Sequence, residues 1–299
     1  MEKIEKKIEW EGKTGGGNFG QSFLFFIFKL VPPYFIYPLL YFIIPFYLIT
    51  DKKRIYIYRY FRKNFCFSKL KSLRYTYINY LAFGKIVLDK FAILAGRVNC
   101  FRFNIVGHDF LKDLLKEGRG AVIVSAHIGN FEMAGVALKD SKIKINSLIF
   151  GEEFEKIKKQ RNSVYSDSNI HTISVQKDMS HLFSIKSVLE NKEFLTVLCD
   201  RNFGSTKKFS VKFLGDDAFL PQGPFRLAAQ MDVPVVSLFI MKQNFRKYAI
   251  YIARIDEKTQ EESVILRAKK LSESFAKEME FVLNLYPTQW FNYFDFWEK

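Results

Sequence analysis

Of the four histidines in the chain, His127 has the neighbours best suited to acid–base chemistry. It follows the apolar run at residues 120–126 and precedes Gly129, Asn130 and Glu132. The run has the composition of a buried strand, a glycine permits a tight turn, and asparagine commonly caps the start of a helix. We therefore expect His127 at the carboxyl end of a strand, where its imidazole could act as a general base.

Glu132 is a candidate for the group that orients this imidazole. Residues five apart on a continuous helix point about 140° away from each other, because the helix has 3.6 residues per turn. A turn at Gly129 would instead allow Glu132 to face His127. The carboxylate would hold one ring nitrogen and leave the other to take a proton from a hydroxyl. The spacing alone occurs by chance, and a turn histidine satisfied by a helix N-terminus is the alternative, but the strand-turn-helix context favours a functional site.

A second set of polar residues follows another apolar run. Asp200 and Arg201 come directly after residues 194–199, which are predicted to form a buried strand. Sites in open α/β sheets lie beyond the carboxyl ends of the strands, so both side chains could reach the cleft of His127. Arg201 could bind a phosphate or stabilise an oxyanion, although a local ion pair in a turn is the alternative. Gly223, before a predicted helix, could offer backbone N–H groups to an anion or could simply form a turn.

The elements that must position these residues alternate between strands and helices. This alternation predicts an α/β fold with a largely parallel central sheet flanked by helices. Strands are expected at residues 100–106, 121–126, 146–150, 171–175, 194–199, 210–214, 233–241 and 248–255. Helices are expected at residues 75–95, 109–116, 131–138, 152–166, 179–190, 223–230 and 262–285.

An apolar segment near the N-terminus predicts contact with a membrane. Residues 23–49 carry one charge, at Lys29, and are long enough to span a bilayer, but four prolines argue against one straight helix. We expect a broken or re-entrant helical hairpin within one leaflet, followed by a basic and aromatic flank at residues 51–67 on the cytoplasmic side. A helical pair packed on the globular domain is the alternative. The predicted domains are this membrane-associated part, residues 1–67, and an α/β domain, residues 68–299.

The composition indicates the same kind of partner. The net charge of +15 predicts an acidic binding partner, and the 33 Phe and 15 Tyr suit a membrane interface. The basic residues lie beside aromatic stretches without a nucleic-acid-binding motif, so we expect an anionic lipid surface and no nucleic acid. A solvated basic surface without a specific partner is the alternative. The cysteines and the other histidines lack ligand spacing, so no metal is predicted, and Cys199 is expected in the core.

Five blocks of the sequence resemble, in the right order, the lipid A biosynthesis acyltransferases of the lauroyl and myristoyl type, within the lysophospholipid acyltransferase superfamily. The blocks are residues 125–132 (SAHIGNFE), 198–204 (LCDRNFG), 213–228, 233–236 (VPVV) and 287–290 (PTQW). The N-terminal portion is similar to a membrane-anchored branch of the family. The resemblance therefore covers nearly the whole chain.

The resemblance implies that a fatty acyl group moves from an acyl carrier protein or coenzyme A thioester to a hydroxyl of a lipid or glycolipid precursor. The reaction would need no cofactor and would take place at the cytoplasmic face of the cell inner membrane. His127 would be the base and Glu132 would orient it, but some related enzymes use an acid of the second block, which makes Asp200 a rival partner. The substrate-binding residues expected on this basis are Arg201, Asn130, Gly204 and Gly223.

Two departures from the family pattern concern the acceptor. Asn202 stands where the family commonly has a second acid, and the chain ends in aromatic instead of basic residues. The acceptor could therefore be an aminolipid or a polyene in place of a lipid A precursor. A membrane lipid-binding protein that keeps the fold without turnover is the non-enzymatic alternative, and its function would survive the change His127→Ala.

Overall fold

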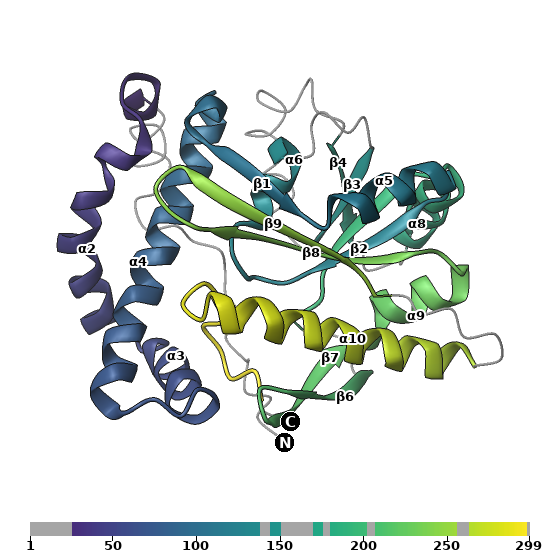
Figure 1. The fold of residues 1–299 in the computed structure, drawn as a ribbon. Helices are drawn as coiled ribbons and strands as arrows, with labels where there is room; N and C mark the ends of the chain where they lie inside the picture. Colours follow the sequence, from purple (N-terminus) through teal and green to yellow (C-terminus); the bar gives the residue numbers. More distant parts are fainter. Residues whose placement is uncertain are drawn as a thin grey trace, which may run out of the picture.

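A mixed sheet forms the centre of the molecule (Figure 1). The computed structural model describes residues 26–137, 144–150, 170–175, 180–201, 207–255 and 263–297. Within these residues one seven-stranded sheet has the order β1-β9-β8-β2-β5-β3-β4. Its strands are β1 (Arg102–Val106), β2 (Ala121–Ser125), β3 (Ile145–Phe150), β4 (Ile170–Val175), β5 (Phe194–Leu198), β8 (Val235–Lys242) and β9 (Lys247–Arg254). The five strands from β8 to β4 are parallel to one another, whereas β9 pairs antiparallel with β8 and parallel with β1.

Strand β2 lies in the middle of the sheet, between β8 and β5. All five of its residues, Ala-Val-Ile-Val-Ser, are buried, and seven of the eight residues of β8 are buried as well. Parallel strands that are covered on both faces have continuous apolar sequences of this kind, with many β-branched residues. Polar side chains that are accessible to a substrate are therefore expected beyond the ends of these strands.

Helices and a two-stranded hairpin surround the sheet. The helices beside it are α5 (His108–Glu117), α6 (Ala134–Ala137), α8 (His181–Glu190), α9 (Gln222–Met231) and α10 (Val264–Leu285), and the hairpin consists of β6 (Lys208–Phe213) and β7 (Asp216–Pro221). Helix α10 packs on α9, β8 and β6 and crosses the molecule below the sheet in Figure 1. Its buried residues include Leu271, Phe275, Met279 and Val282, and this spacing of three and four residues gives one apolar face.

Two long helices from the N-terminal third stand together at one side of the sheet (Figure 1). After a helical turn at residues 26–30 and the short helix η1 (Pro33–Phe35) come α2 (Tyr37–Thr50), α3 (Arg54–Arg59), η2 (Tyr60–Asn64), α4 (Lys69–Leu94) and η3 (Val98–Cys100). The buried residues of α2 are Tyr37, Leu40 and Ile44, and α2 packs on α4. None of the helices within the described ranges combines the length and the apolarity that crossing a membrane requires.

The structure confirms the predicted α/β class with a mostly parallel sheet. In place of the predicted hairpin, the described part of residues 23–49 has one longer helix, α2, whose partner is α4. The chain breaks at Pro32 and Pro33, whereas Pro45 lies inside α2 without ending it. The antiparallel direction of β9 and the strand β7 were not predicted, and the helix predicted at residues 152–166 falls outside the described residues. The domain boundary at residue 67 stays a prediction, and the hydrophobic core includes residues from both sides of it.

Candidate active site

The register of two neighbouring strands brings His127 and Asp200 together. Strands β2 and β5 are parallel, and their last residues, Ser125 and Leu198, are paired. His127 and Asp200 each follow two residues later, at the carboxyl edge of the sheet. Two side chains that are 73 positions apart in the sequence therefore meet without any long loop between the strands and the site.

Asp200 holds the histidine through both of its carboxylate oxygens. Oδ1 lies 2.8 Å from His127 Nδ1, and Oδ2 accepts the backbone N–H of His127 at 3.0 Å. A carboxylate at Nδ1 keeps the ring proton on that nitrogen, so the lone pair is on Nε2. Burial by itself would raise the pKa of Asp200, but the charge and hydrogen bonds of His127 together with the charge of Arg201 outweigh it and hold this pKa below its usual value. The carboxylate is thus ionised in an almost fully buried position, where its charge is poorly screened.

Glu132 has a different position from the one that the sequence suggested. Its carboxylate forms an ion pair with Lys90 of α4, with 2.6 Å between Oε1 and Nζ. Residues 131–133 form the short 3₁₀ helix η4, and Glu132 together with Lys90, Ile93, Asn130 and Met133 lines a small recess. Of the two rival partners, the structure therefore places Asp200 against the imidazole and Glu132 against a lysine.

The loop that carries His127 is fixed by its own backbone. Gly129 has a φ of 65°, which favours glycine, and a Cβ at this position would lie 2.2 Å from the carbonyl oxygen of Ile240. Asn130 stands at the start of η4, as predicted, but its side chain makes no cap and instead donates to the hydroxyl of Tyr248 at 3.4 Å. The backbone N–H of Asn130 donates to the Ile240 carbonyl at 2.7 Å. Asn130 is thus buried support for the loop.

Residues 287–293, here called the C-terminal segment, lie directly against the His127 loop. The N–H of Gly129 donates to the carbonyl of Gln289 at 2.7 Å, and the N–H of Phe291 donates to the carbonyl of His127 at 3.0 Å. Between these bonds Ile128 and Trp290 form an isolated antiparallel bridge. The Trp290 indole Nε1 lies 3.4 Å from Asp200 Oδ2 and donates to it.

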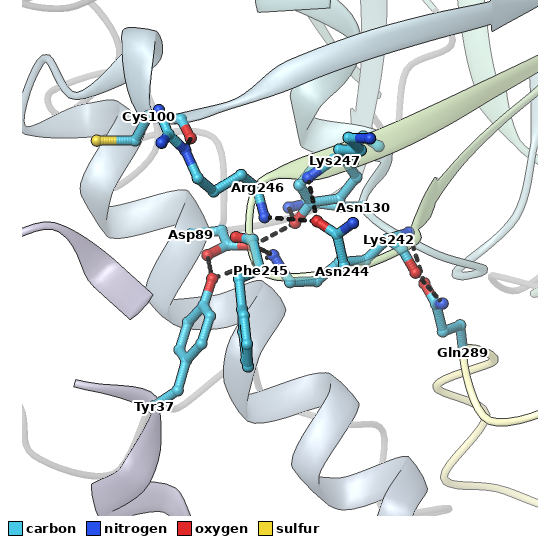
Figure 2. A network of polar contacts seen from close by, with 11 residues as sticks. Tyr37, Asp89, Cys100, Asn130, Lys242, Asn244, Phe245, Arg246, Lys247 and Gln289 are labelled. Carbon is cyan, nitrogen blue, oxygen red and sulfur yellow. Dashed lines mark hydrogen bonds and ion pairs between the residues drawn. The ribbon is translucent and has the colours of Figure 1, made fainter. Parts of the chain in front are cut away.

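A buried group of charges lies behind the loop and connects it to the N-terminal helices (Figure 2). Lys242, at the end of β8, forms an ion pair with Asp89 of α4. The hydroxyls of Tyr37 and Tyr248 both donate to the same carboxylate. The amide of Gln289 bonds both backbone groups of Lys242, at 2.9 and 2.7 Å. Burial raises the pKa of Asp89 and lowers the pKa of Lys242, and the charge of each opposes the shift of the other.

The structure defines the positions of the remaining predicted site residues in less detail. The Arg201 guanidinium lies over the Phe294 ring, with 5.7 Å from Cζ to the ring centroid. Gly223 is exposed in the first turn of α9. Gly204 lies outside the described residues. The predicted core position of Cys199 is confirmed, since its side chain is fully buried.

Sequence reasoning missed the supporting roles of Asp89, Lys242, Gln289 and Trp290. For two of them a signal was present, because Asp89 and the adjacent Lys90 interrupt the otherwise apolar residues 86–94, and Lys242 ends the apolar run at residues 235–241. A charge in such a stretch is costly to bury unless it has a partner. Gln289 and Trp290 belong to the PTQW block that resembles the family, but the resemblance assigned neither of them a role.

An imidazole held by a buried carboxylate, beyond the carboxyl ends of parallel strands, has the geometry that a general base requires. The comparison with known families defines the chemistry more closely. Residues 91–298 match the family of bacterial lipid A biosynthesis acyltransferases. The match covers well over half of the chain and includes the whole seven-stranded sheet, so the protein belongs to this family and is an acyltransferase. No curated protein matches the chain.

Proposed function

We propose that the enzyme transfers a fatty acyl chain from an acyl carrier protein or coenzyme A thioester to a hydroxyl of a lipid or glycolipid precursor, with His127 as the general base. Membership of the lipid A family supports the reaction type. The observation that carries the choice of base is the 2.8 Å contact between His127 Nδ1 and the buried Asp200 carboxylate. This contact leaves Nε2 as the ring nitrogen that can accept a proton.

In the proposed reaction the acceptor oxygen attacks the thioester carbonyl carbon while its proton moves to Nε2 of His127. A carbon–oxygen bond forms, and the carbonyl becomes a tetrahedral oxyanion. When the intermediate collapses, the carbon–sulfur bond breaks and the imidazolium returns its proton to the departing sulfur. The products are an ester and a free thiol. Asp200 stabilises the imidazolium between these steps, as the carboxylate of a serine protease triad does.

The positions of the other residues suggest how substrates are held. We assign Arg201 to an anionic part of the substrate or to the oxyanion, because it neighbours Asp200 in sequence and its charge acts on that carboxylate. Gly204 and the N–H groups at Gly223 are proposed as further contacts with the substrate, and Asn130 as support for the loop. Glu132, paired with Lys90, is given no role in proton transfer.

The proposed place of action is the cytoplasmic face of the inner membrane. Helix α2 exposes large apolar side chains on the side away from α4, among them Leu39, Phe42, Phe46 and Ile49. The chain that follows, residues 52–74, contains nine Lys and Arg and no Asp or Glu. An apolar helix face next to a basic stretch suits an interface with anionic lipid. Sedimentation of the protein with phosphatidylglycerol vesicles, compared with phosphatidylcholine vesicles, tests this part of the proposal.

The function is tested by lipid mass spectrometry on a host that expresses the wild type, His127→Ala or His171→Ala. His171 is an exposed histidine of β4 and provides the matched control. We expect one lipid to gain a single acyl chain in the wild type and in the control. With His127→Ala the rate should fall by about 10²- to 10⁴-fold, which is the usual contribution of a general base. The proposal would be abandoned if His127→Ala, at equal expression, produced as much acylated lipid as the wild type.

The same experiment identifies the acceptor. The added mass gives the acyl chain, and the modified lipid shows whether the acceptor is a lipid A precursor, an aminolipid or a polyene. Hosts of different lipid composition extend the range of acceptors that are sampled.

A further inference from the structure

Trp290 links the C-terminal segment to the proposed catalytic pair. Its backbone is bridged to Ile128, the chain neighbour of His127, and its side chain donates to Asp200. The indole is fully buried. The hydrogen bond of 3.4 Å is long, but its acceptor is a buried carboxylate, and hydrogen bonds to charged groups are stronger than neutral ones.

Each oxygen of the Asp200 carboxylate has its own hydrogen-bond partners. Oδ1 faces the imidazole Nδ1, while Oδ2 receives the backbone N–H of His127 and the indole N–H of Trp290. A carboxylate rotates easily about its terminal torsion, because that torsion is broad. Two donors on Oδ2 restrict this rotation and so keep Oδ1 directed at the ring.

The indole itself cannot turn away. Aromatic rings surround it edge to face: Tyr60 at 5.2 Å, Phe213 at 5.4 Å, Phe296 at 4.9 Å and Trp297 at 5.7 Å between ring centroids. The backbone is held as well, because the side-chain amide of Asn79 donates to the carbonyls of Thr288 and Trp290 at 3.0 and 2.8 Å. A donor held this rigidly gives a fixed direction at little entropic cost.

We propose that Trp290 is a positioning residue, whose indole N–H fixes the Asp200 carboxylate in the orientation that aligns His127 for proton transfer. This inference rests on the proposed function of His127. It assigns to the tryptophan an effect on the catalytic rate constant and little effect on substrate binding, because the indole lies behind the carboxylate and is closed off from solvent.

Trp297 provides a matched control within the same aromatic cluster. It also packs against Trp290, Phe213 and Tyr60, but its buried Nε1 has no hydrogen-bond partner among the residues that the structure describes. The change Trp297→Phe therefore removes a similar volume of aromatic ring without removing a hydrogen bond. A purely structural role for Trp290 would give the two variants similar behaviour.

The test measures thiol release from dodecanoyl-coenzyme A, or from the corresponding carrier-protein thioester, with detergent-dispersed host lipid as acceptor. For Trp290→Phe we expect kcat to fall about tenfold at nearly constant KM, which is the lower end of what losing a hydrogen bond to a charged group costs. KM should stay nearly constant because the indole is buried behind the carboxylate and does not face the substrate. Trp297→Phe should change neither kcat nor KM. Equal losses of kcat in the two variants, or a loss in Trp290→Phe that appears in KM instead of kcat, would overturn the proposal.

A second measurement keeps the proposal testable even where Trp290→Phe does not fold. The chain has three tryptophans, Trp10, Trp290 and Trp297, so the indole resonance of Trp290 in ¹⁵N-labelled protein is assigned from Trp10→Phe and Trp297→Phe. It should shift in Asp200→Asn, which replaces the charged acceptor by a neutral amide, and should stay in place in Glu132→Gln, whose carboxylate pairs with Lys90. A Trp290 resonance that is unchanged in Asp200→Asn would refute the contact. This result is independent of turnover, and it is therefore distinguishable from a failure of the proposed function, in which His127→Ala keeps full activity.

Discussion

The two acidic candidates for the partner of His127 can be separated by one pair of substitutions. Asp200→Asn keeps the shape of the side chain but replaces an acceptor by an amide N–H₂ group. The Asp200 side chain is 1% exposed, so solvent does not screen the interaction that is lost. An amide facing Nδ1 favours the tautomer with its proton on Nε2, which cannot then accept a proton. In a serine protease the same change lowers kcat about 10⁴-fold, and we expect a similar loss here, equivalent to roughly 5.5 kcal/mol of transition-state stabilisation.

Glu132→Gln is the matching control. Its ion pair with Lys90 is partly exposed, at 20% and 33% of the two side chains, and pairs of this kind contribute about 0–1 kcal/mol. The expected loss in kcat is therefore below about fivefold. Initial rates of acyl transfer from dodecanoyl-coenzyme A give both numbers, and circular dichroism reports whether the variants are folded. The reasoning is refuted if folded Asp200→Asn retains more than a tenth of the activity while Glu132→Gln loses nearly all of it.

Two further predictions concern the support of the loop. Gly129→Ala forces a methyl group to within 2.2 Å of the Ile240 carbonyl oxygen at a φ of 65°. We expect this variant to lose more than about 2 kcal/mol of unfolding free energy and most of the activity. Gly118→Ala, at a φ of 58° with open space around it, should lose only about 1 kcal/mol. Urea denaturation of both variants measures the difference, and equal stabilities would contradict the clash. Lys242→Met leaves the Asp89 carboxylate buried without its cation and should destabilise the protein by about 3–5 kcal/mol, and a second change, Asp89→Asn, should restore part of that loss. A double variant less stable than Lys242→Met alone would show that the ion pair is not the reason.

The sequence was sufficient to predict that His127 and Asp200 lie at the carboxyl edge of the sheet, because apolar strand sequences and the polar residues that follow them are local patterns. It could not decide between Glu132 and Asp200. Glu132 is close to His127 along the chain, but nearness along the chain does not fix the direction of a side chain. Asp200 meets His127 through the register of β2 against β5, and register depends on the packing of the whole sheet.

Dependence on contacts between distant parts of the chain also explains where the predicted strands differ from the structure. The direction of β9 depends on a tight connection from β8 at residues 243–246, which a strand pattern does not reveal. Strand β7 contains Asp216 and Asp217 and a closing proline, Pro221, so its composition is poor in strand-forming residues. It nevertheless pairs with β6, because a turn at Leu214 and Gly215, both with positive φ, returns the chain along β6.

The hydrogen bonds between the histidine loop and the C-terminal segment can form only late in the synthesis of the chain. A ribosome that has just made His127 must add about 160 further residues before Trp290 exists, which at roughly 5–20 residues per second takes on the order of 10–30 s. Throughout that interval the nascent chain lacks the strand partner of Ile128 and the second donor to Asp200. The contacts around the proposed catalytic pair are therefore completed only after the apolar helix α2 and all seven strands of the sheet have been synthesised. A message that stops short of codon 290 would yield a polypeptide that contains His127 and Asp200 but lacks the indole N–H that we propose holds the Asp200 carboxylate in place.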